Sequence, residues 1–166
     1  REQKKHVTRT LSPLTQEHLN AFLQHLAIMP EDKVLIFEVA LATGMRLQEV
    51  LTIPESIIFN PESTYPIPVS IGPKNGVKTK FSKQRHVEFP ASLMFKLHQY
   101  LWSSRRQRYA AKGKNESGKL FISRQGMPFN SNTIEKSFSD IRSVLSKQYV
   151  DFNYAIHDLR STYATY

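Results

Sequence analysis

The sequence contains no cysteine, which excludes disulfide bonds and thiolate metal sites. No apolar run is long enough to span a bilayer, and the polar first five residues show no signal-peptide pattern. A glycine-rich phosphate loop, a paired-carboxylate cluster and a metal-ligand spacing are also lacking. These absences favour a soluble, cytoplasmic protein without the common nucleotide or metal motifs.

The length and the apolar content fit one domain, because 166 residues with 40% hydrophobic side chains can bury a core of ordinary size. The chain opens on arginine rather than methionine, which suggests that it was excised from a longer protein. Residues 1–12 are polar and basic, so they are expected to be a linker into a domain at residues 13–166.

Positive charge is abundant and unevenly distributed, with a formal net charge of +9. Residues 63–133 hold 13 Lys and Arg against only Glu88 and Glu116, so this segment carries +11 and the remainder is slightly negative. The commonest partner of such a one-sided excess is a nucleic-acid phosphate backbone. An anionic membrane is a weaker alternative, because no basic stretch forms an amphipathic helix with an exposed apolar face. A soluble protein that merely has a high pI is the third reading.

Hydrophobic periodicity predicts an α+β fold that is mainly helical. Thr15 can cap an amphipathic helix, and residues 34–42 read as a helix buried on several sides that Gly44 can end in a left-handed conformation. Three β-rich pieces, at 56–59, 67–71 and 86–89, predict a three-stranded antiparallel sheet with a long basic hairpin at 73–85. The other expected helices cover 46–51, 91–111, 131–148 and 155–166.

Three short segments combine basic and polar residues in patterns suited to chemistry. The first is ATGMRLQEVL at residues 42–51, where Arg46 follows a glycine turn and Glu49 lies one helical turn further on. A helix cap followed by a surface arginine in a weak ion pair with Glu49 is the bland alternative.

The second segment, VKTKFSKQRHVEFP at residues 77–90, is a basic hairpin whose flexible lysines stand in a cationic surround. Neighbouring positive charge lowers the pKa of a lysine and so suits it to proton donation. The alternative is a hairpin that only follows a DNA backbone. The basic residues assigned to DNA contact here are Lys74, Lys78, Lys83 and Arg85.

The third segment, IHDLRSTYAT at residues 156–165, contains the pattern His-x-x-Arg. Helical spacing places His157 and Arg160 on one face, where both can reach the same phosphate. An imidazole also titrates near neutral pH. The bland alternative is a helix N-terminus with a partly buried histidine.

Together these segments resemble the tyrosine recombinase family, whose members include phage integrases, integron integrases and Xer proteins. They occur in the family's order, and the segments between them match its helices and sheet over most of the chain. The resemblance implies the DNA breaking-rejoining fold. It also makes residues 1–12 a linker from a preceding DNA-binding domain.

The resemblance also assigns roles to individual residues. Arg46 and Arg160 would grip oxygens of the scissile phosphate, and Glu49 would orient that network. His157 would donate a hydrogen bond or accept a proton from the nucleophile. Lys80 would protonate the leaving 5′ oxygen, with Lys78 as the runner-up because the spacing to Arg85 favours Lys80.

The implied reaction is a transesterification through a 3′-phosphotyrosyl intermediate, for site-specific recombination or integration of double-stranded DNA. No cofactor is implied, since the covalent link conserves the bond energy for rejoining. Full-length relatives commonly act as a homotetramer on two duplexes.

The sequence departs from the family at its end. The family's nucleophilic tyrosine and a second His or Trp follow tens of residues after His-x-x-Arg, but this chain stops six residues after Arg160. Tyr163 should fill an aromatic core position, and both Tyr163 and Tyr166 are interpreted as structural. The 166 residues are therefore expected to bind DNA without forming a covalent adduct.

Three other classes remain as alternatives. A type IB topoisomerase uses the same chemistry, although the compact spacing of the three segments favours a recombinase. A non-catalytic DNA-binding module would explain the charge alone. A metal-dependent nuclease is the least favoured, because no carboxylate cluster is present.

Overall fold

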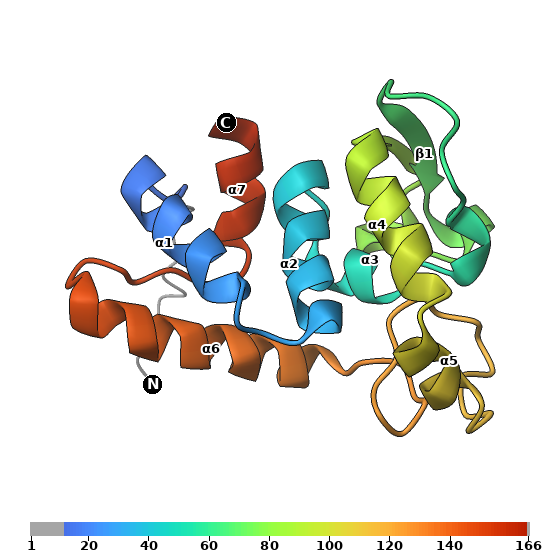
Figure 1. Cartoon of the computed structure of the whole chain (residues 1–166). Coiled ribbons are helices and arrows are strands. Elements are labelled where there is room, and N and C mark those ends of the chain that lie inside the picture. The colour runs from blue at the N-terminus through green and yellow to red at the C-terminus, as the bar shows by residue number, and fades with distance from the viewer. Residues whose placement is uncertain (1–11, 166) are drawn as a thin grey trace, which may run out of the picture.

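The computed structural model describes residues 12–165 (Figure 1), so the expected linker, apart from Ser12, and Tyr166 lie outside the described residues. The described part is an α+β fold, as expected. Its secondary structure comprises α1 (Gln16–Leu26), α2 (Glu31–Thr43), α3 (Leu47–Leu51), the 3-10 turn η1 (Glu55–Ile57), β1 (Ile67–Ile71), the 3-10 turns η2 (Pro73–Asn75) and η3 (Lys80–Ser82), β2 (Arg85–Phe89), α4 (Ala91–Leu101), α5 (Ser104–Ala110), α6 (Ser131–Gln148) and α7 (Asp158–Thr165).

Helix α2 forms the centre of the molecule, because it is apolar on nearly every side. It packs against α3, α4, α7 and strand β2 (Figure 1). Its end at Gly44 is confirmed, with φ at 70° and the glycine N–H bonded to the carbonyl of Ala40 at 3.1 Å. The predicted cap of α1 is also confirmed, since the Thr15 side chain accepts from the backbone N–H of His18.

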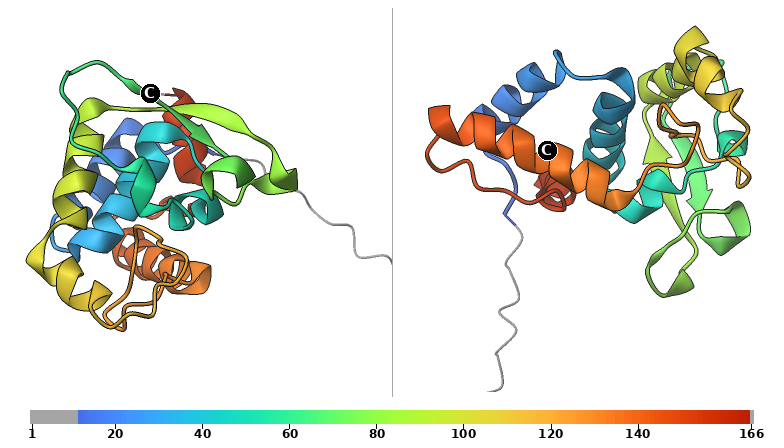
Figure 2. Two further views of the ribbon diagram at one scale, coloured as in Figure 1. Left: turned by 90° about the vertical axis from the view of Figure 1, so that its right-hand side faces the viewer. Right: turned by 90° about the horizontal axis from the view of Figure 1, so that it is seen from below.

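Helix α6 covers one side of the molecule and has the expected bounds. It runs beneath α1, α2 and α7 (Figures 1 and 2) and contacts α1 and α3. Its buried stripe includes Ile134, Phe138, Ile141 and Leu145, one residue for each successive turn.

The sheet has two strands rather than the expected three. β1 and β2 pair antiparallel with Ile67 opposite Phe89 and Ile71 opposite Arg85. Residues 56–59 form no strand, because backbone donors there are already engaged: the N–H of Ile57 bonds to the carbonyl of Pro54, and that of Ile58 to the carbonyl of Glu55. Just before them, the N–H of Glu55 bonds to the carbonyl of Gly118. Residues whose composition favours a strand therefore overlap a 3-10 turn here.

The expected helix at 91–111 is divided into α4 and α5. Ser103 lies between them in an extended conformation, and its side chain accepts from the N–H of Arg106 at 3.3 Å. A serine that caps a new helix competes with continuation of the old one. Helix α7 likewise begins at Asp158 rather than at the expected Ala155.

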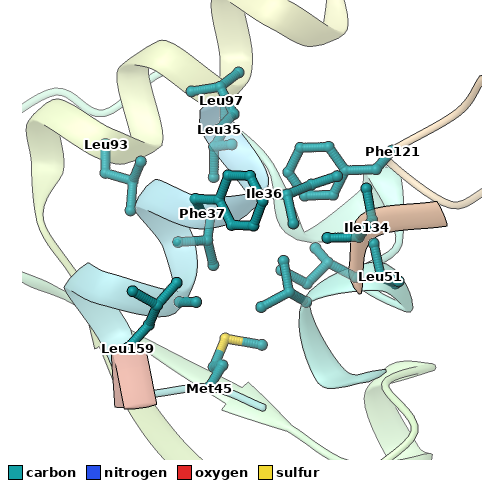
Figure 3. Close-up of a cluster of buried hydrophobic side chains, with 14 of the residues drawn as sticks. Leu35, Ile36, Phe37, Met45, Leu51, Leu93, Leu97, Phe121, Ile134 and Leu159 are labelled. Carbon is teal, nitrogen blue, oxygen red and sulfur yellow. The ribbon is translucent and has the colours of Figure 1, made fainter. Parts of the chain in front are cut away.

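The hydrophobic core joins the segments that carry the basic residues of interest. Met45 and Leu159 lie in the same buried cluster (Figure 3), with 1% and 0% of their surfaces exposed. Each directly precedes an arginine, so burial of the two apolar residues anchors Arg46 and Arg160 to one core. Within residues 12–165, no helix combines the length and apolarity needed to cross a membrane.

Candidate functional site

Arg46 is positioned by the turn that ends α2. The Thr43 hydroxyl donates to the carbonyl of Val39 at 2.6 Å and accepts from the N–H of Met45 at 3.2 Å. After the left-handed Gly44, the backbone of Arg46 is extended and precedes α3. Its side chain stays 39% exposed, so it can reach a ligand at the surface while its backbone is fixed.

Glu49 is a buried carboxylate bound by two arginines. It accepts the backbone N–H of Arg46 at 2.9 Å, and both of its oxygens accept from the Arg85 guanidinium at 2.5 and 2.7 Å. Burial alone would raise the pKa of Glu49, but these hydrogen bonds outweigh it and hold the pKa below the ordinary value. Glu49 is therefore ionised, and its carboxylate holds the backbone of Arg46 and the guanidinium of Arg85.

Arg160 projects from α7, which packs directly on α2. Its Nε donates to the carbonyl of Gly44 at 2.7 Å, which fixes the guanidinium plane and leaves its terminal nitrogens for a ligand. Burial, followed by the charges of Arg46 and Arg85, lowers the pKa of Arg160. A lowered pKa is expected where several cations lie close together, and such a cluster would stabilise an anionic ligand.

A pocket of about 390 Å³ brings Arg46, Lys80, His157 and Arg160 together. His157 is exposed and directly precedes α7, where its carbonyl accepts from the N–H of Arg160 at 3.1 Å. The four residues come from three segments up to 114 positions apart in sequence. The pocket thus unites the basic residues of all three sequence motifs.

Lys80 projects from turn η3 in the basic hairpin. The hairpin is tethered near α3, where the N–H of Lys78 donates to the Thr52 hydroxyl at 2.9 Å. The Nζ of Lys119 adds bonds to the carbonyls of Thr52 and Gly76 at 3.1 and 2.8 Å. Lys80 lines the pocket, whereas Lys78 is exposed and does not. The geometry therefore favours Lys80 over Lys78.

The comparisons with known proteins bear on this arrangement. A sequence model described as "Phage integrase family" matches residues 12–166, which is most of the chain. The chain belongs to the phage integrase family. A comparison with curated protein sequences gives no match.

Solved structures share the fold of this phage integrase family member. The Tn1549 transposon integrase, in complex with a circular intermediate DNA, aligns over 97% of the chain with a TM-score of 0.70 and 14% identity. XerH recombinase bound to a difH substrate aligns over 92% with a TM-score of 0.66 and 20% identity. XerA recombinase aligns over 95% with a TM-score of 0.65 and 21% identity. The chain spans 54%, 41% and 51% of those three chains.

Tyr163 does not fill the core position expected for it in the family's His-x-x-Arg segment. Its side chain is 45% exposed, and the ring lies against Gly44, close enough that a Cβ there would be 2.6 Å from Cδ1. Helix α7 places it about one turn after Arg160. Among residues 12–165, no tyrosine lines the pocket that contains Arg46 and Lys80.

The remaining residues assigned to DNA contact differ in their surroundings. Lys74 and Lys83 are exposed on the hairpin. Arg85 is half-buried, and its guanidinium is engaged with Glu49. The role of Arg85 as a DNA contact therefore stays a prediction, while its contact with Glu49 is the observed one.

Sequence reasoning missed two features of this family member's site. The pairing of Arg85 with Glu49 joins positions 36 apart, and no local pattern links them. Glu135, an exposed residue of α6, also lines the pocket and places a carboxylate among its basic groups. Within residues 12–165, no three His, Asp or Glu side chains are grouped closely enough to hold a metal ion.

Proposed function

We propose that this chain is the phosphate-binding part of a tyrosine-type site-specific recombinase, an enzyme that breaks and rejoins double-stranded DNA. The observation that carries the proposal is the single pocket lined by Arg46, Lys80, His157 and Arg160. Family membership and the fold shared with DNA-bound recombinases support it.

The proposed mechanism assigns each pocket residue one task. Arg46 and Arg160 bind non-bridging oxygens of the scissile phosphate, where negative charge grows as a tyrosine hydroxyl attacks. His157 hydrogen-bonds to the reacting oxygens or takes the tyrosine proton. Lys80 gives a proton to the departing 5′ oxygen, and its exposed, flexible stem allows it to reach that atom.

The guanidinium of Arg160 and the backbone of Arg46 are fixed before DNA arrives. Arg160 is held by the Gly44 carbonyl, and the backbone of Arg46 by Glu49. Groups that are already oriented toward the developing charge need little reorganisation during the reaction. Electrostatic stabilisation is therefore the main contribution of this part of the enzyme.

The proposal extends to the whole protein. The 166 residues bind DNA but form no covalent adduct, because none of the tyrosines in residues 12–165 lines the pocket. The enzyme acts in the cytoplasm, and its full-length form works as a homotetramer on two duplexes.

In the first experiment, the full-length protein is incubated with duplex DNA, and a denaturing gel is used to detect a DNA strand linked to tyrosine. Wild-type protein is expected to form the adduct in the presence of EDTA, and Lys80→Ala to lose it. Lys78→Ala is the matched control, since both lysines are exposed on the same hairpin. Equal loss in the two variants would contradict the assignment of Lys80.

Arg46→Ala and Arg160→Ala should each slow formation of the adduct by about a hundredfold or more, because each removes a donor to the charged transition state. Lys147→Ala, at the far end of α6, is the control for the loss of one positive charge. Relaxation of supercoiled DNA without strand exchange would point to a topoisomerase. Cleavage that EDTA prevents would overturn the proposal.

A further inference from the structure

Asp158 and Thr162 are two buried polar residues of α7 that the proposed mechanism does not use. Their exposed fractions are 0% and 2%, although α7 lies at the edge of the pocket and carries Arg160. Buried polar groups cost free energy unless they are hydrogen-bonded, so their partners reveal what they hold in place.

Both residues bind the segment through which the chain enters the domain. Asp158 Oδ1 accepts the backbone N–H of Ser12 at 3.1 Å, and Thr162 Oγ1 accepts that of Leu14 at 2.9 Å. The two contacts join positions 146 and 148 apart in sequence. The incoming segment is thus bonded at two points, one helical turn apart, to the helix of the phosphate site.

The same two side chains also fix α7 internally. Asp158 Oδ2 accepts the N–H of Ala155 at 2.7 Å, and the Thr162 hydroxyl donates to the carbonyl of Asp158 at 2.8 Å. The carboxylate therefore bridges the incoming segment and the loop that leads to His157. A shift of the incoming segment would be transmitted to the first turn of α7 and to the loop before it.

The position of α7 in turn determines where Arg160 lies. Only one hydrogen bond, from Nε to the Gly44 carbonyl, fixes its guanidinium against the turn that carries Arg46. Helix α7 packs on α2, and the bonds to Ser12 and Leu14 give its first turn a second attachment. The segment at Ser12 and Leu14 is thus an external support for the phosphate site.

We propose that Asp158 and Thr162 are positioning residues through which the incoming segment Ser12 to Leu14 orients Arg160 and His157. The part of the proposal that concerns DNA affinity rests on the proposed function. The part that concerns the orientation of Arg160 is independent of the proposed function. Any group that pulls on the chain before Ser12, such as a preceding domain, would change the phosphate site through these two contacts.

The test uses variants that remove one contact each. Ser12→Pro deletes the N–H that Asp158 accepts. Ser12 is exposed and precedes Pro13, so its backbone is already restricted to extended conformations that proline tolerates. Ser12→Ala keeps the N–H and is the matched control.

Thr162→Val removes the second contact while keeping the shape of the side chain. Thr165→Val makes the same chemical change on the same helix, where the hydroxyl only donates to the carbonyl of Ser161 at 3.0 Å. Thr162→Ser restores the hydroxyl and should rescue. If Thr162→Val fails to fold, the Ser12 pair still decides the question, because that residue is outside the core.

The first readout is the Nε–Hε resonance of Arg160 in the DNA-free chain, with amide exchange of Leu14 as a direct report on its bond. Both contact-deleting variants should shift the resonance, whereas Ser12→Ala and Thr165→Val should leave it in place. A role confined to stability would lower the denaturant midpoint without moving this resonance in the folded protein. An unmoved resonance would overturn the proposal.

The second readout is affinity for duplex DNA under conditions where every variant is folded. Ser12→Pro and Thr162→Val should each weaken binding by about twofold to tenfold, the effect of one hydrogen bond. Equal weakening by Thr165→Val would overturn the proposal. If the wild-type chain does not bind DNA but the Arg160 resonance still responds, the proposed function fails and the positioning role stands.

Discussion

At the scale of single residues, Glu49 organises the site. A carboxylate with 1% of its side chain exposed is tolerable only because Arg85 binds both of its oxygens and the Arg46 backbone donates to it. The sequence predicted that Glu49 would orient Arg46. It could not reveal Arg85 as the partner, because burial and pairing across 36 positions are properties of the fold.

The lowered pKa of Glu49 predicts acid sensitivity. In the folded state the carboxylate holds its proton less tightly than in the unfolded chain, whose pKa lies near 4.5. Its stabilising contribution is therefore complete above that pH and is lost as the pH falls through the lower folded-state value. Urea midpoints measured from about pH 7 to about pH 3 should show this loss in the wild type.

Glu49→Gln should be less stable at neutral pH, because it leaves the Arg85 charge half-buried without an anionic partner. Its midpoint should also fall less steeply with acid. Glu38→Gln, which removes a surface ion pair with Lys96, is the control and should change little. Parallel acid profiles for wild type and Glu49→Gln would contradict the role of Glu49.

At the scale of elements, the turn between α2 and α3 carries Arg46 and binds the side chain of Arg160. Gly44 allows the left-handed turn, offers its carbonyl to Arg160, and leaves room for the ring of Tyr163. The sequence could predict the turn, since a glycine after a buried helix is a strong local signal. It could not predict that Tyr163 would cover the turn rather than enter the core.

Gly44→Ala is expected to destabilise the protein by more than the left-handed conformation alone, which costs about 1–2 kcal/mol. A Cβ would also lie 2.6 Å from Cδ1 of Tyr163 and so displace α7. Gly113→Ala is the matched control: its φ is +68°, but nothing lies within 4 Å of the added Cβ. Chemical denaturation of both variants measures the difference.

The double variant Gly44→Ala/Tyr163→Ala separates the two effects. It should recover the part of the loss that comes from the steric contact, but not the conformational part. DNA binding should fall in Gly44→Ala and remain unchanged in Gly113→Ala. Equal stability losses at the two glycines would contradict the close contact.

Local signals also explain which elements the sequence placed well. Helix α6 and strand β1 have long or regular apolar patterns, and their bounds agree with expectation. The break at Ser103 depends on a side-chain hydrogen bond to the backbone, and the turn at Glu55–Ile57 on backbone hydrogen bonds. Those at Glu55 involve a distant segment, which composition cannot show.

At the scale of the whole molecule, charge along the chain overstates the positive surface. Four basic residues of the segment 63–133 are paired with acidic residues outside it, and these pairs are Arg85 with Glu49, Lys96 with Glu38, Arg105 with Asp32, and Arg106 with Glu55. Folding thus cancels part of the +11 that the sequence places in this segment. The prediction of a DNA partner rests more firmly on the pocket than on the net charge.

The remaining basic residues form two groups on the surface. One is the hairpin group of Lys74, Lys78, Lys80 and Lys83, next to the pocket. The other surrounds α5 at the lower right of Figure 1 and includes Arg108, Lys112, Lys114 and Arg124. Net charge alone does not distinguish between them as the main DNA contact, whereas the pocket favours the first.

The most direct test of this account follows the arginine Nε–Hε resonances of the 166-residue chain during titration with a short duplex. The account predicts that the resonances of Arg46 and Arg160 shift most, while those of the internally paired Arg106 stay in place. Arg108 and Arg124 should respond little. Shifts concentrated at Arg108 and Arg124, with Arg46 and Arg160 unmoved, would contradict the claim that the pocket binds a DNA phosphate.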